Sequence, residues 1–274
     1  MKKSRILILA FILVAGVLAG CGKAEDKKES GNTVVKVGLT GTIYEDIWKP
    51  VAEDLKTEGI DIELVQFSDY SLPNEALNSG EIDLNAFQHH AYFKNDVESN
   101  GYDITSIGDT MVMAMNLYSD SIKDVSELKD GDKVAVPNDA SNEGRALKLL
   151  ESAGIIQIKE SAGANPSLGD IEKYNVKIDI KEVNAADICA LLPDVKAAVI
   201  NGNYALDYGI DPDKEAIFYE TEYDDDSYFC LIAARSDEAD SEIYKKIVEA
   251  FQSENTKKIF KEEFKGFFVP AWEK

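Results

Sequence analysis

Two stretches of the chain repeat the same alternation of apolar strands and amphipathic helices, and this repeat narrows the possible folds. The first stretch predicts a strand from Val34 to Leu39, a helix from Tyr44 to Glu58 and a strand from Ile62 to Phe67. A helical stretch near Asn74 to Asn78 and a strand from Ile82 to Ala86 complete it. Strands that alternate with helices predict a mostly parallel sheet.

The second stretch begins about 100 residues later and follows the same order. It predicts a strand from Lys133 to Val136, a helix from Asn142 to Ser152, and strands from Val176 to Lys181 and from Ala197 to Ile200. We therefore expect an α/β fold with two lobes, each a mostly parallel sheet flanked by helices.

The closing segment is too short to form a third lobe. It predicts a strand from Phe229 to Ala233 and helices from Glu242 to Gln252 and from Asn255 to Phe264. We expect it to return to the first lobe, so that residues 34–118 and 230–274 form lobe 1 and residues 119–229 form lobe 2. Two crossover strands would then join the lobes near Ser119 and Tyr228. Ligands of such folds bind beyond the carboxyl ends of the strands, where the lobes face each other.

The N-terminus predicts export. Basic residues precede an apolar stretch from Ile6 to Leu18, which indicates a signal peptide at residues 1–20 and is too short to cross a bilayer comfortably. Small residues before Cys21 resemble the lipobox of bacterial lipoproteins. This resemblance implies cleavage before Cys21, acylation of that cysteine and anchoring of the chain at the extracytoplasmic face of a cell membrane. The polar residues 22–32 predict a flexible tether, so residues 21–32 comprise the lipidated Cys21 and its tether.

Charge and motifs exclude several classes of function. With 51 acidic and 29 basic residues the formal net charge is −22, so we expect no binding to nucleic acid. The chain has no Gly-x-Ser-x-Gly, no phosphate-binding glycine loop, no Cys-x-x-Cys and no His-Glu-x-x-His, and we predict neither enzyme activity nor a cofactor. His89 and His90 are the only histidines, and as neighbours they would point to opposite sides, which argues against a metal site. Cys189 and Cys230 could pair or remain buried free thiols.

Arg145 and a group of aromatic residues are the candidates for binding. Arg145 falls in the first turn of the helix predicted to begin near Ser141 or Asn142, where an anion would balance its charge. The alternatives are exposure to solvent or pairing with Glu143. The aromatic residues follow the second and third predicted strands and would line the cleft or belong to the core; they are Tyr70, Phe87, His89, Tyr92 and Phe93.

Several motifs together resemble the NlpA/MetQ family of methionine-binding lipoproteins. They occur in order from about Val34 to Trp272. They are Phe67-Ser68-Asp69-Tyr70, Phe87-Gln88-His89, Val136-Pro137-Asn138-Asp139, Asn142-Glu143-Gly144-Arg145-Ala146-Leu147, Ala197 to Ala205, and Phe264-Lys265-Gly266 with Pro270-Ala271-Trp272.

The resemblance implies a type II periplasmic-binding-protein fold and a monomer that captures methionine for an ABC importer with a membrane permease and an ATPase. By position, Arg145 would hold the ligand carboxylate and Asn201 the amino group. The thioether side chain would lie among aromatic residues; these are Tyr70, Phe87, His89 and Tyr92. Asn138, within the motif Val136-Pro137-Asn138-Asp139, and Cys230 complete the predicted ligand-binding residues.

The chain departs from the family pattern at three places. Cys230 stands where an asparagine usually helps to bind the amino group, and a thiol is a weak acceptor. The stretch from Met111 to Met115 and Gly202 also differ from the usual residues. A different amino acid, a methionine-containing dipeptide, or a surface adhesin or adaptor with lost ligand binding therefore remain as alternatives.

Overall fold

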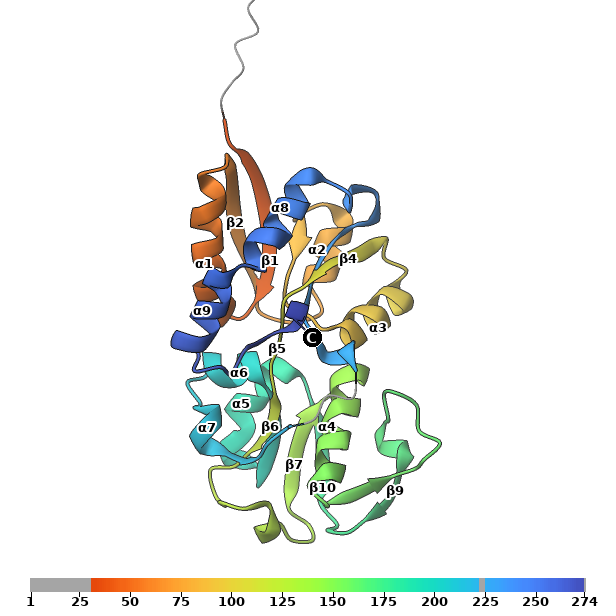
Figure 1. The fold of residues 1–274 in the computed structure, drawn as a ribbon. Helices are drawn as coiled ribbons and strands as arrows, with labels where there is room; N and C mark the ends of the chain where they lie inside the picture. Colours follow the sequence, from red (N-terminus) through yellow and green to blue (C-terminus); the bar gives the residue numbers. More distant parts are fainter. Residues whose placement is uncertain (1–30, 222–224, 274) are drawn as a thin grey trace, which may run out of the picture. The chain divides into compact units, whose positions relative to one another are not determined.

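The computed structural model describes residues 31–221 and 225–273, and its strands form two five-stranded sheets (Figure 1). The strand orders are β2-β1-β3-β13-β4 and β10-β7-β11-β6-β12. The predicted signal peptide and Cys21 lie outside the described residues. In the part of the chain that is described, no helix is both long and apolar enough to cross a membrane.

The first sheet joins the N-terminal repeat to the closing segment. Its strands are β1 (Thr33–Thr40), β2 (Ile60–Phe67), β3 (Leu84–Asn85), β4 (Ile104–Asp109) and β13 (Leu231–Arg235). Its helices are α1 (Ile43–Lys56), α2 (Pro73–Ser79), α3 (His90–Asn100), α8 (Glu242–Phe251) and α9 (Glu254–Glu262). Strands β1, β2 and β3 are parallel, and β13 runs antiparallel between β3 and β4. The prediction that the closing segment returns to the first sheet is confirmed.

Apolar residues bury α1 against this sheet as its helical pattern predicts. Ile47, Val51 and Leu55 are buried on one face, together with Tyr44 and Trp48. The ring of Trp48 contacts the ring of Phe251 at 5.0 Å between centroids, which packs α1 against α8.

The second sheet contains the other repeat. Its strands are β6 (Met115–Tyr118), β7 (Lys133–Pro137), β10 (Asp179–Val183), β11 (Ala197–Asn201) and β12 (Ala216–Phe218). Its helices are α4 (Ala140–Ser152), α5 (Ile188–Leu191), α6 (Gly202–Asp207) and α7 (Pro212–Glu215). Two further strand pairs lie outside the sheets, β5 (Met111–Val112) with β14 (Val269–Pro270) and β8 (Ile156–Ile158) with β9 (Ile171–Tyr174). Neither pair was predicted, because all four strands are short and those of the β8–β9 pair are mostly exposed.

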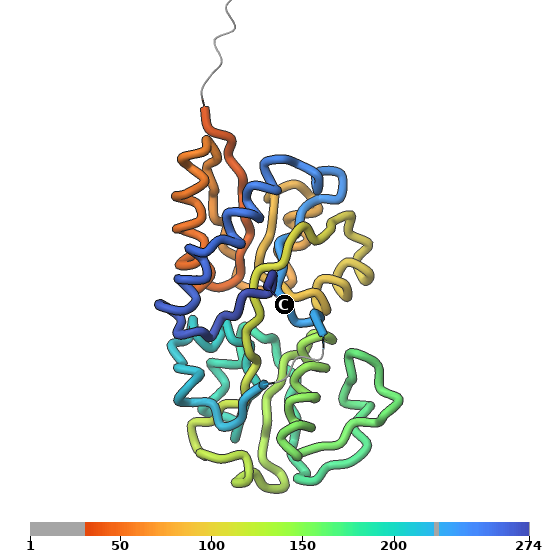
Figure 2. The backbone as a smooth tube through the Cα atoms, viewed as in Figure 1, coloured from red at the N-terminus to blue at the C-terminus, as the bar shows by residue number. Residues whose placement is uncertain are grey.

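The chain passes between the two sheets twice (Figure 2). Strand β6 pairs with β11 and β12, so the first passage precedes Met115 and is earlier than the predicted crossing at Ser119. All four residues of β6 are buried, which suits a strand inside a sheet rather than a connecting segment. The second passage lies between Phe218 and Leu231 and includes the predicted position Tyr228. The bounds of the two lobes stay a prediction.

Helix α4 begins two residues earlier than predicted, and this changes the position of Arg145. The carboxylate of Asp139 accepts a hydrogen bond from the backbone N–H of Asn142, so Asp139 is the N-cap and Ala140 the first helical residue. Arg145 therefore lies in the second turn, and its predicted place in the first turn is wrong. Because the effect of the helix dipole fades beyond the first turn, the charge of Arg145 needs another explanation.

Candidate functional site

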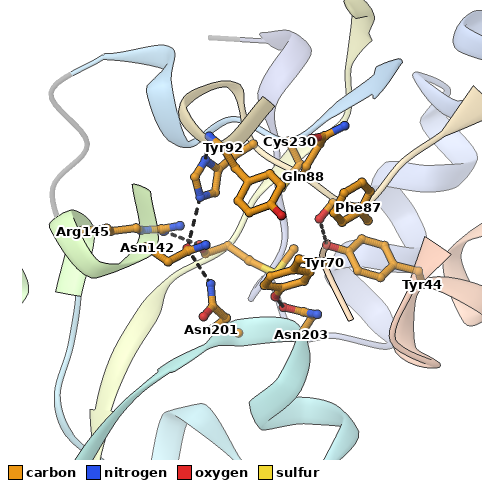
Figure 3. A pocket seen from close by; sticks show the side chains of 13 residues that line it. Tyr44, Tyr70, Phe87, Gln88, Tyr92, Asn142, Arg145, Asn201, Asn203 and Cys230 are labelled. Atoms are coloured by element: carbon orange, nitrogen blue, oxygen red, sulfur yellow. Dashed lines mark hydrogen bonds between the residues drawn. The ribbon is translucent and has the colours of Figure 1, made fainter. Parts of the chain in front are cut away.

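A narrow pocket lies where chain segments from both sheets meet, and we call it the inner pocket (Figure 3). Its lining contains seven of the eight predicted ligand-binding residues. The lining residues are Tyr44, Tyr70, Phe87, Gln88, His89, Tyr92, Met113, Asn142, Arg145, Asn201, Gly202, Asn203 and Cys230. The cavity volume open to water is only about 30 Å³, so the walls of the pocket lie close together in this conformation.

One wall consists of rings that follow β2 and β3, and we call Tyr70, Phe87, His89 and Tyr92 the aromatic wall. Ring centroids lie 5.9 Å apart for Tyr70 and Phe87, 5.9 Å for Tyr70 and Tyr92, and 6.0 Å for Phe87 and Tyr92. These spacings are typical of aromatic pairs that stabilise each other. The sequence left open whether these rings line a cleft or belong to the core, and the structure places them on the pocket.

The opposite wall is polar, and we call Asn142, Arg145, Asn201 and Asn203 the polar wall. They come from α4, from the end of β11 and from the start of α6. The apolar run of β11 ends at Asn201, at the carboxyl edge of the sheet where ligands of α/β folds bind.

Asp139 fixes the direction of a hydrogen-bond chain through this wall. A carboxylate only accepts, so the Asn142 Nδ2 amide donates to Asp139 at 3.0 Å and the Asn142 Oδ1 oxygen faces away. That oxygen accepts from His89 Nε2 at 3.2 Å and from Asn201 Nδ2 at 2.8 Å. Asn201 Oδ1 is left buried without a donor among the described residues. An unpaired buried acceptor is costly, and a ligand N–H would satisfy it.

His89 is held as a neutral ring. Its Nδ1 accepts from the backbone N–H of Tyr92 at 3.1 Å, which caps α3 and leaves the proton on Nε2. Burial, and then the charge of Arg145, lower the pKa of His89 to about 3. In the described part of the chain no group of three or more metal-ligating side chains comes together.

Arg145 is buried and paired with an acid that the sequence did not indicate. Its Nε donates to Glu220 Oε1 at 2.7 Å and its Nη2 to Glu220 Oε2 at 2.5 Å. Nη2 also donates to the carbonyl oxygen of Met113 at 2.8 Å, and the guanidinium carbon lies 4.4 Å from the centre of the Tyr228 ring. The alternatives of solvent exposure and of pairing with Glu143 do not apply, since Glu143 accepts from the backbone of Leu168.

Cys230 lines the pocket, but Asn138 does not. Cys230 forms an isolated β-bridge with His89, and burial raises the pKa of its thiol to about 12. A neutral thiol offers a ligand ammonium group little attraction. Cys230 and Cys189 are both free, so the possible disulfide does not form. Asn138 is exposed, and it is absent from the lining of the pocket.

Contacts across the pocket join the two walls. Tyr70 Oη donates to Asn203 Oδ1 at 2.6 Å, and Asn203 Nδ2 donates to the carbonyl oxygen of Thr40 at 3.2 Å. At the other end of α6, the Asp207 carboxylate accepts from the backbone N–H groups of Thr42 at 3.0 Å and Ile43 at 2.8 Å, and from Thr42 Oγ1 at 2.8 Å. Helix α6 of one sheet thus caps α1 of the other.

Sequence reasoning did not assign a role to several residues of the site. Asn142 and Asn203 stood inside the quoted motifs, and their positions, in the first turn of α4 and just after β11, were a usable signal. Glu220 had no local signal, because the residue it pairs with lies 75 positions away.

The comparisons with known proteins cover nearly all of the described chain. The model of the NlpA lipoprotein family matches residues 35–272. The D-methionine-binding lipoprotein MetQ of Salmonella typhimurium is 40% identical, over 93% of this chain and 93% of the relative. Outer membrane lipoprotein 3 of Mannheimia haemolytica is 42% identical, over 87% of this chain and 90% of the relative.

A solved structure agrees with these relatives. The nutrient binding protein from Burkholderia cenocepacia, solved bound to methionine, superposes with a TM-score of 0.82 at 40% identity and covers 86% of this chain and 99% of its own. This agreement supports the predicted two-lobed α/β binding-protein fold. The chain belongs to the NlpA lipoprotein family.

Proposed function

We propose that the chain is a solute-binding lipoprotein that captures methionine or a closely related amino acid in the inner pocket. One observation carries this proposal: a buried guanidinium, and an amide oxygen that no described residue donates to, lie at one end of a pocket whose other wall is aromatic. The relatives named for methionine, and the one solved with it, have the same fold and family.

Each wall would bind a different part of the ligand. Arg145 would attract the α-carboxylate, and Asn201 Oδ1 would accept a hydrogen bond from the amino group. Tyr70, Phe87 and Tyr92 would surround the thioether, because polarizable sulfur packs favourably against rings. Asn142 and the neutral His89 would keep the Asn201 amide in the orientation that leaves its oxygen available.

Delivery completes the proposed function. A lipid on Cys21 would hold the protein at the extracytoplasmic face of a cell membrane, where a monomer would pass its ligand to the permease and ATPase of an ABC importer. A ligand that contacts both walls favours the closed arrangement by its higher affinity for it, and a permease can distinguish that arrangement. The narrow pocket and the contacts between the walls match a closed form.

Titration calorimetry on the chain without residues 1–21 tests the proposal. The ligands are L-methionine, D-methionine and glycyl-methionine, after bound ligand has been removed by unfolding and refolding. We expect saturable binding of at least one of them with 1:1 stoichiometry. Binding of glycyl-methionine alone would assign the site to dipeptides. No heat and no rise in melting temperature with any of the three would overturn the proposal and favour a protein that has lost its ligand.

A further inference from the structure

Glu220 is a largely buried acid that lies behind the inner pocket. It follows β12, and its side chain is 9% exposed against 5% for Arg145. It does not line the inner pocket but borders a second, outer hollow, and Arg145 borders both. The Arg145–Glu220 pair therefore separates the two spaces.

The fold holds this pair in place from several sides. Glu220 Oε2 also accepts from the backbone N–H of Met115 at 2.8 Å, and the backbone N–H of Glu220 donates to Asn116 Oδ1 at 2.9 Å. Both partners belong to β6, a fully buried strand. A buried carboxylate with three donors on its two oxygens is a built feature rather than a chance surface contact.

The pair contributes one charge of each sign at the site. Among the described residues that line the inner pocket, Arg145 is the only charged side chain, since His89 is neutral. Glu220 balances that charge from behind. A zwitterion adds no net charge to this buried region, whereas a carboxylate without an ammonium group adds an uncompensated negative charge, which is costly away from water.

We propose that Glu220 is the internal counter-charge of the ligand site and makes it select zwitterionic ligands over carboxylate anions of the same shape. This inference rests on the proposed function and adds a specificity-determining residue to it. A ligand carboxylate that took the Nε and Nη2 nitrogens of Arg145 would have to displace Glu220, so the zwitterion must bind beside the existing ion pair.

Calorimetry with L-methionine and its 2-hydroxy analogue of the same configuration tests the inference, because the two ligands differ only at the α-substituent. The variant Glu220→Gln keeps the size and one acceptor of the side chain and removes the charge. We expect the ratio of the dissociation constants, 2-hydroxy analogue over methionine, to fall at least tenfold in this variant. The control Glu182→Gln removes the same charge from an exposed position on β10 and should leave the ratio unchanged.

The outcomes separate the two proposals. If neither ligand binds the unmodified protein, the proposed function fails. If both bind and Glu220→Gln, folded by circular dichroism, leaves the ratio unchanged, only the counter-charge is overturned. Should that variant not fold, the unmodified protein still provides a test: a 2-hydroxy analogue bound as tightly as methionine would overturn the counter-charge.

Discussion

The two walls of the inner pocket are built by different physical rules. The aromatic wall consists of rings that contact each other at about 6 Å, so each ring is already packed and the surface it offers is non-directional. The polar wall contains a directed chain of donors and acceptors that starts at Asp139 and ends in an Asn201 oxygen with no donor among the described residues. The first wall therefore tolerates variation in ligand shape, while the second fixes the orientation of the head group.

Removing the guanidinium should break the polar wall with the largest effect. Arg145→Ala would leave the buried Glu220 without its partner and the ligand carboxylate without its cation, and truncating a buried charge pair costs roughly 2–5 kcal/mol. We expect methionine affinity to fall about 100-fold or more in calorimetry, together with a lower melting temperature.

The matched control is Lys148→Ala, which removes a cation from the same helix that borders the outer hollow and not the inner pocket. Unchanged affinity in a folded Arg145→Ala protein would move the carboxylate site elsewhere.

Replacing a ring should sharpen the comparison, because it changes selectivity rather than orientation. Phe87→Leu keeps an apolar surface and removes one π-face, and sulfur–aromatic contacts contribute roughly 0.3–1.5 kcal/mol. We expect methionine affinity to fall about tenfold and norleucine affinity to fall only about threefold, measured by calorimetry on the same preparations. Equal losses for both ligands would mean that the ring contributes bulk and not sulfur recognition.

The aromatic wall could be predicted from the sequence far better than the polar wall. Tyr70, Phe87 and Tyr92 follow strand ends, and parallel strands bring their carboxyl ends together, so local pattern was enough. The Arg145–Glu220 pair depends on how β12 and its following segment return to α4, which no local pattern encodes. The first turn of α4 was misplaced for a related reason: Asp139 competed with Ser141 and Asn142 as a cap, and all three residue types are good caps.

Replacing Asp207, which caps α1, tests whether the two walls are held together from outside the pocket. Asp207→Ala would remove three hydrogen bonds at the start of α1, and loss of a helix cap costs typically about 1 kcal/mol. Asp207 does not line the pocket, so it can affect binding only through the contact between α6 and α1. We expect a roughly fivefold weaker methionine affinity, mainly because the ligand dissociates faster. Asp194→Ala, an exposed acid in the same part of the chain, serves as the control. A melting temperature that falls with no change in affinity would limit Asp207 to stabilising α1.

The smallest effect distinguishes two adjacent histidines, one on the aromatic wall and one outside the pocket. His90 Nε2 lies 2.7 Å from Asp109 Oδ1, and this hydrogen bond raises the pKa of His90 above its usual 6.5. Its stabilisation is therefore fully present below pH 6.5 and is lost as the pH rises through the raised value. The His90 side chain is 31% exposed, so the effect is small. We expect the free energy of unfolding, measured with urea, to fall by only about 0.5 kcal/mol between pH 5.5 and pH 8.5.

His90→Gln should remove this pH dependence. His89→Gln should retain it, because a ring that stays neutral to about pH 3 has no charge to lose in that interval. If His89→Gln instead changed how the free energy of unfolding depends on pH, the buried ring itself would titrate in this interval.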